Sequence, residues 1–135
     1  MNNPRISAKE RGLIKGALRR VFSRSDLRRS VLEAAIVEHS DPKRKRVKTW
    51  VKCAECKKPE AKSNVAVDHI LPVIPLNSSL EEMTVDDLVN RIWCEKKNLQ
   101  VLCISCHLVK TKVESKERRL NKKGKKNVRQ KRKIA

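Results

Sequence analysis

The sequence predicts an α+β fold in which helices flank a small centre that contains strands. Three observations carry this prediction. Apolar residues recur at helical spacing near both ends of the chain. Short runs of alternating residues, typical of strands, lie in the middle. Two Cys-x-x-Cys pairs, Cys53/Cys56 and Cys103/Cys106, bracket that middle region.

Two helices are expected before the first cysteine pair. Ser7 is the expected N-cap of a helix over residues 7–22, because Glu10 follows it at the spacing of a capping box. A second helix is expected to begin at Ser25 or at the next residue, with an apolar face that runs to Ile36.

The middle and the end of the chain supply the other expected elements. In order, these are a strand over residues 47–52, a strand over 64–70, a loop over 72–83, a short helix capped by Thr84 and Asp87, and a helix from 104 to about 118. Residues 119–135 have almost no apolar side chains and are expected to be disordered when free. The expected organisation is therefore a basic helical extension (1–46), a central domain (47–118) and a basic tail (119–135).

The composition leaves little material for a core. Of the 135 residues, 39% are hydrophobic and 2% aromatic, and a small core of this kind usually needs a staple such as a structural metal. No apolar run approaches the ~20 residues of a membrane span, and the N-terminus lacks the apolar segment of a secretory signal. We therefore expect a cytoplasmic protein with no membrane partner, whose cysteines stay reduced.

The formal charge of +19 is unevenly distributed. Residues 1–48 carry +9, residues 49–118 carry +1, and residues 119–135 carry +9. This pattern indicates a polyanionic partner, most simply nucleic acid. The two basic segments would bind it on either side of the nearly neutral centre. The alternative is a solvated surface that aids solubility.

Seven basic residues are the candidates for contacts with DNA. Three arginines crowd the first turn of the second expected helix, where the helix dipole disfavours cations, and this indicates a ligand. Ordinary exposed arginine is the alternative for each of them. The other four form a basic linker that serves as a hinge, as a strap along phosphates, or as both. The seven residues are Arg24, Arg28, Arg29, Lys43, Arg44, Lys45 and Arg46.

The paired cysteines predict a structural zinc site. Each Cys-x-x-Cys presents two thiolates from a tight knuckle, and two such pairs complete one tetrahedral site. A closed four-sulfur site has no open position, so the zinc is expected to be scaffold and not catalyst. Cys94, the fifth cysteine, is expected to be a small buried hydrophobe and not a ligand.

Three residues near the knuckles carry side chains suited to metal and acid–base chemistry. Asp68 and His69 end the second expected strand, and His107 directly follows the second cysteine pair. A zinc ion that joins the knuckles would bring His107 near the strand that carries the other two residues. One carboxylate oxygen and one imidazole nitrogen can then hold a divalent ion, while His69, on the other side of the strand, stays free as a base.

The order and spacing of these motifs resemble a known family. Cys-x-x-Cys, Val-Asp-His-Ile-x-Pro and Asn-Leu-Gln-x-Leu-Cys-x-x-Cys-His-x-x-Lys-Thr, within about residues 50–112, look like the motifs of the HNH endonucleases. The resemblance implies a ββα-metal (His-Me finger) core with a four-cysteine zinc. The basic N-terminal helices are similar to those of small phage-encoded members. One departure is the loop over 73–79, where many members have Gly-Gly after the proline.

The resemblance also implies a role for each motif residue. His69 would be the general base, Asp68 and His107 the ligands of a catalytic Mg²⁺ or Mn²⁺, and Asn98 the asparagine that braces the base or the metal loop. The implied activity is hydrolysis of DNA phosphodiester bonds, by nicking or by double-strand cleavage. The implied setting is a phage homing or packaging nuclease in the bacterial cytoplasm, with a terminase or other packaging protein as partner. The alternatives are a non-catalytic, zinc-stabilised DNA-binding module and a packaging accessory protein.

Overall fold

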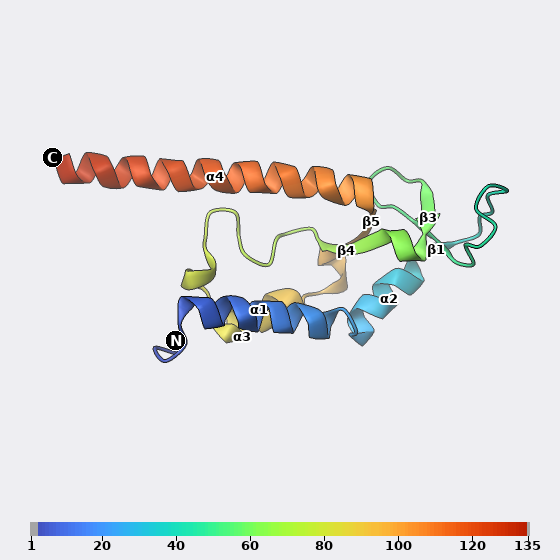
Figure 1. Cartoon of the computed structure of the whole chain (residues 1–135), viewed down its shortest axis with the longest axis horizontal. Helices are drawn as coiled ribbons and strands as arrows, with labels where there is room; N and C mark the ends of the chain where they lie inside the picture. Colours follow the sequence, from blue (N-terminus) through green and yellow to red (C-terminus); the bar gives the residue numbers. More distant parts are fainter. Residues whose placement is uncertain (1–2, 135) are drawn as a thin grey trace.

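Helices lie on both sides of the strands in the computed structural model, which describes residues 3–134 (Figure 1). Within that range, four α-helices and two small antiparallel sheets give an α+β architecture, as predicted. Helix α4 (Ile104–Ile134) runs along one side and helix α1 (Ala8–Phe22) along the other, with the loop that follows residue 70 between them. No described helix combines the length and the apolar composition that a membrane span requires.

The two N-terminal helices begin where the sequence predicts. The backbone N–H of Glu10 donates to Ser7 Oγ, and the Ser7 N–H donates to the Glu10 carboxylate, each over 3.1 Å, so the capping box of α1 is complete. Helix α2 (Asp26–Ala34) is capped by Ser25. The prediction that its apolar face runs to Ile36 was wrong, because Ile36 leaves the helix and pairs with a strand.

The strands form two antiparallel sheets. The first has the order β1 (Ile36–Val37), β2 (Trp50–Lys52) and β3 (Pro59–Ala61), and the second pairs β4 (Val65–His69) with β5 (Leu99–Cys103). The register of the second sheet sets Asp68 opposite Gln100. The strands expected over 47–52 and 64–70 are present in shorter form. The residue patterns did not predict the other three strands. Strands β1 and β3 are two or three residues long and are defined by their pairing with β2, and β5 is defined by its pairing with β4.

Two apolar clusters hold the helices against the sheets. The larger cluster joins α1 to β5, to the loop after β4 and to the helix before β5, and it contains Phe22, Val73, Ile74, Met83, Leu88, Ile92 and Leu99. The smaller cluster joins α2 to both sheets and contains Leu32, Val51, Val65 and Val101. Cys94 is half-buried and packs against the larger cluster, in agreement with its expected role as a small hydrophobe.

Most of the remaining described elements lie between β4 and β5, and one short helix precedes β4. Helix α3 (Val85–Ile92) begins after Thr84, which forms the predicted capping box with Asp87. Three short 3-10 helices span Lys62–Asn64, Leu80–Glu82 and Lys96–Asn98. They lead the chain into β4, α3 and β5 respectively.

Helix α4 is longer than the sequence predicts. The prediction of a disordered tail over residues 119–135 was wrong, because the helix continues to Ile134 and only Ala135 of this segment lies outside the described residues. Lys, Arg and Gln have good helix propensity, which composition alone weighs too lightly against their charge. Side chains of α4 also donate to loop carbonyls, as Asn121 does to Leu76 (3.0 Å) and Lys125 to Asn77 (2.6 Å). These two hydrogen bonds join segments that are distant in the sequence, so the sequence alone does not predict them.

Candidate active site

The four paired cysteines meet at one point. Their sulfur atoms all lie within 4.8 Å of one another, with Cys56 and Cys103 Sγ 4.0 Å apart, so the group could hold a metal such as zinc. The first knuckle is fixed to β5, because the Ala54 N–H donates to the Val101 carbonyl over 2.8 Å. Lys57 turns the chain back with a φ of 64°, the left-handed conformation that tight turns require. The predicted ligand set is therefore assembled by the fold.

The electrostatic surroundings of Cys53 favour a thiolate. Burial raises its pKa, but backbone N–H groups from Cys103, Cys56 and Glu55 point toward the sulfur and lower the pKa to about 6. Because the thiolate is the form that binds metal, Cys53 is prepared to be a ligand near neutral pH. Cys53 is also fully buried, whereas Cys56 is exposed and the other two cysteines are half-buried, so a metal held there would lie at the edge of the fold.

Asp68 and His107, near the cysteine knuckles, come together as predicted. Asp68 is at the end of β4 and His107 is in the first turn of α4. Asp68 Oδ1 lies 3.8 Å from His107 Nε2. Bonds from Mg²⁺ to its ligands are about 2.0–2.1 Å long, so two ligand atoms of one ion are at most about 4.2 Å apart. The pair is thus close enough to share a divalent ion.

Two residues that were not assigned a role complete the surroundings of Asp68. Its second oxygen, Oδ2, accepts from Gln100 Nε2 (3.0 Å) and from Lys110 Nζ (3.1 Å). Lys110 also donates to the His69 carbonyl (3.1 Å) and pairs with Glu114. Burial lowers the pKa of Lys110, but its bonds to Glu114 and Asp68 outweigh burial and raise the pKa overall. Lys110 therefore stays charged and fixes one carboxylate oxygen, leaving Oδ1 toward His107.

A pattern in the sequence could have identified Lys110 but not Gln100. Lys110 stands three positions after His107, which sets the two on one face of a helix. Gln100 is directly opposite Asp68 on the paired strand, so the two side chains share a face of the sheet. Only the register of the strands, which the sequence does not give, reveals the second relation.

His69 is held in one orientation. Its Nε2 lies 2.8 Å from the Ile92 carbonyl, and its ring packs against Phe22 with the ring centres 5.4 Å apart. A carbonyl can only accept a hydrogen bond, so Nε2 carries the proton and the neutral ring keeps its lone pair on Nδ1. The half-buried ring is therefore set up to accept a proton at Nδ1.

Asn98 braces the chain that follows His69. Its Oδ1 accepts from the Leu71 N–H over 2.8 Å, and its backbone carbonyl accepts from the Ile70 N–H, also over 2.8 Å. Asn98 makes no contact with Asp68 or His107 among the hydrogen bonds of the described residues. It is a positioning residue, because it acts on the backbone at the end of β4.

Replacing Asn98 is expected to loosen this connection. Asn98→Ala removes the acceptor of the Leu71 N–H and should lower the free energy of unfolding by about 1 kcal/mol, measured by urea denaturation. Asn98→Asp keeps an oxygen acceptor and should restore most of the loss. Asn90→Ala, at an exposed asparagine of α3, is the matched control. Equal losses for Asn90→Ala and Asn98→Ala would contradict the bracing role.

The seven basic residues proposed for DNA contact lie outside this site. Arg29 pairs with Asp26 (2.9 Å), as the alternative of ordinary surface arginine expects. Arg44 pairs with Glu60 (2.7 Å) and lies over the ring of buried Trp50, so it has a structural role. Arg28 donates weakly to a backbone carbonyl, and Arg24 borders a shallow hollow beside α2. The exposed linker residues Lys43, Lys45 and Arg46 remain available for a ligand.

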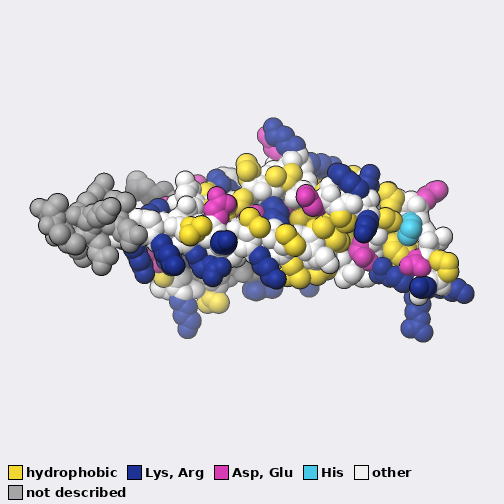
Figure 2. Space-filling model, turned by 90° about the horizontal axis from the view of Figure 1, so that it is seen from above, with side chains coloured by type: hydrophobic (Ala, Val, Ile, Leu, Met, Phe, Trp, Pro, Cys, Tyr) yellow, Lys and Arg dark blue, Asp and Glu magenta, His cyan; other side chains and the backbone are white. Residues whose placement is uncertain are grey.

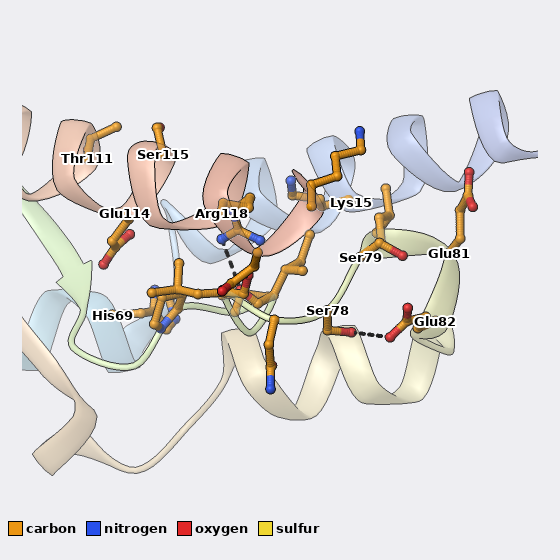
Figure 3. A pocket seen from close by; sticks show the side chains of 18 of the residues that line it. Lys15, His69, Ser78, Ser79, Glu81, Glu82, Thr111, Glu114, Ser115 and Arg118 are labelled. Carbon is orange, nitrogen blue, oxygen red and sulfur yellow. Dashed lines mark hydrogen bonds between the residues drawn. The ribbon is translucent and has the colours of Figure 1, made fainter. Parts of the chain in front are cut away.

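A cleft of about 1100 Å³ runs from the site along the molecule (Figure 3). Helices α1 and α4 form its walls, and the loop over residues 72–82 forms its floor. Asp68, His69 and His107 all line this cleft, so they share one access route for a substrate. Its basic lining residues are Arg11, Lys15, Arg19, Arg118, Lys122, Lys125 and Lys126.

No protein-family model, curated protein or solved structure matches this chain. The function is therefore inferred from the chemistry of its own residues.

Proposed function

We propose that this protein is a divalent-metal-dependent endonuclease that hydrolyses DNA phosphodiester bonds. The proposal extends to a ββα-metal core formed by β4, β5 and α4. The observation that carries it is the convergence of Asp68 and His107, with 3.8 Å between Oδ1 and Nε2, beside a histidine whose tautomer is set. A zinc on the four cysteines would be purely structural, because four protein ligands leave no position for substrate.

Asp68 and His107 are the proposed ligands of the catalytic ion. Their donor atoms, one carboxylate oxygen and one imidazole nitrogen, suit Mg²⁺ or Mn²⁺ with waters and phosphate oxygens as the other ligands. Such an ion would polarise the phosphate and stabilise the leaving oxygen. Gln100 and Lys110 hold the other carboxylate oxygen, as residues that orient a metal ligand commonly do.

His69 is the proposed general base. Its Nδ1 accepts a proton from a water molecule while Nε2 keeps its own proton on the Ile92 carbonyl. The water oxygen attacks phosphorus, and the bond from phosphorus to the 3′ oxygen breaks. The products carry a 5′-phosphate and a 3′-hydroxyl. Asn98 supports this step by holding the backbone that follows the base.

Loss of either proposed ligand should strongly slow cleavage, because it weakens binding of the catalytic ion. A catalytic ion is worth several kcal/mol in the transition state, so Asp68→Asn and His107→Gln should each slow plasmid nicking by roughly 10²-fold or more. Both variants keep the size of the original side chain. Raising the Mn²⁺ concentration should partly rescue them, because weakened binding can be offset by mass action.

The matched controls are Asp86→Asn and His39→Gln, which change the same residue types at exposed positions away from the cleft. They should cleave at the wild-type rate. Wild-type rates in Asp68→Asn and His107→Gln across the whole metal range would reject this pair as the metal site.

A further inference from the structure

Three cations without acidic partners meet in the middle of the cleft. Lys15 and Arg19 stand one turn apart on α1, and Arg118 comes from α4. Figure 3 shows Lys15, from α1, and Arg118, from α4, among the side chains that line the cleft. In the part of the chain that the structure describes, no carboxylate pairs with any of the three. Like charges gathered in this way favour the binding of an anion.

The cleft offers these cations little internal compensation. Glu82 is 3.9 Å from Lys125 and accepts from Ser78, and Glu114 pairs with Lys110 nearer the site. Burial, followed by the charges of Arg19 and Arg118, lowers the pKa of Lys15. An anion between the two walls would relieve this repulsion.

Side chains of both helices that form the cleft walls are hydrogen-bonded to the loop that forms its floor. Arg11 on α1 donates to the Glu81 carbonyl over 2.7 Å. On the other side, Arg118 donates to the Ile74 carbonyl over 3.0 Å and still has guanidinium N–H groups for a ligand. The cleft cannot widen without breaking such bonds. A single strand is narrower than a duplex, and a basic groove that follows one backbone is the usual form of a single-strand site, so a cleft of about 1100 Å³ between two fixed walls suits a single strand.

We propose that the cleft between α1 and α4 binds the phosphates of one nucleic-acid strand, with Lys15, Arg19 and Arg118 as the contacts. The strand continues from these cations toward Asp68, His69 and His107, which line the same cleft. Basic side chains are numerous on the face that α4 presents, alongside exposed hydrophobic ones (Figure 2), and the basic side chains suit a polyanion. The direction of the strand rests on the proposed nuclease function, whereas the binding itself does not.

The test is the affinity of the full chain for a single-stranded oligonucleotide, measured in EDTA so that no cleavage occurs. Each phosphate contact on single strands contributes about 0.7 to the slope of log K against log salt. The double variant Lys15→Gln/Arg19→Gln should therefore reduce the slope by about 1.4 and weaken binding roughly 25-fold at 0.1 M salt. The loss of affinity for a duplex of the same sequence should be smaller.

The control is Lys58→Gln/Lys96→Gln, which removes the same charge from exposed positions outside the cleft that are not among the candidate DNA contacts. Its affinity should change much less than that of the cleft variant. Equal losses in the two double variants, no loss in the cleft variant, or a greater loss for the duplex would each overturn the inference. These outcomes are separate from the proposed function, since a protein that never cleaves DNA can still show the cleft-specific loss, and an active nuclease can lack it.

Discussion

His69→Gln should slow the nicking of supercoiled plasmid by roughly 10²–10⁴-fold, the usual effect of removing a general base. Glutamine can still donate to the Ile92 carbonyl, which now holds Nε2 at 2.8 Å, but its amide has no basic nitrogen. The half-buried position should therefore remain packed while the proton acceptor is lost. Nucleic-acid binding and metal content should match those of the wild type.

His39→Gln is the control for this substitution. His39 is exposed and packs its ring against Trp50, away from the cleft, so its loss should leave the cleavage rate unchanged. Increasing the pH should not rescue His69→Gln, because no titrating group remains at that position. A cleavage rate for His69→Gln within a few fold of the wild type would assign the base to another residue.

Removal of the proposed structural metal should have the largest effect on the fold. Metal binding at four-cysteine sites contributes on the order of 10 kcal/mol to folding in small zinc domains, which is comparable to the whole stability of a domain. Cys53→Ser and Cys103→Ser should therefore lose the metal and the cooperative thermal transition measured by circular dichroism. Treatment with a strong chelator should have the same effect on the wild type.

Cys94→Ala tests the specificity of this prediction. Cys94 lies outside the four-cysteine group and packs against the apolar core, so its replacement should keep one zinc per chain by elemental analysis. A folded, active wild-type protein that contains no zinc would reject the structural role of the four cysteines.

Local signals in the sequence predicted the parts of the fold that depend on neighbours along the chain. The capping boxes at Ser7 and Thr84 each fix a helix start through residues three positions apart, and both are present. The paired cysteines likewise predicted a metal centre that joins two distant knuckles. From that junction followed the proximity of Asp68 and His107.

The parts that the sequence missed depend on contacts between distant segments. Strand β3 contains Pro59 and Glu60, which have low strand propensity, and exists because it pairs with β2. The continuation of α4 past Arg118 is supported by loop carbonyls that no local pattern reveals. The cleft arises in the same way, since Lys15 and Arg118 are far apart in the sequence and meet only when both helices pack on the loop.

The most direct test of the proposed catalytic centre is the incubation of the zinc-loaded protein with supercoiled plasmid, with Mg²⁺ in one sample and EDTA in another. We expect nicked or linear DNA with Mg²⁺ and intact plasmid in EDTA, because the proposed roles of Asp68 and His107 require a divalent ion. Intact plasmid in both samples, from a folded protein that retards the same DNA on a gel, would reject the proposed catalytic centre. That result would identify the chain as a zinc-stabilised nucleic-acid-binding module without catalysis.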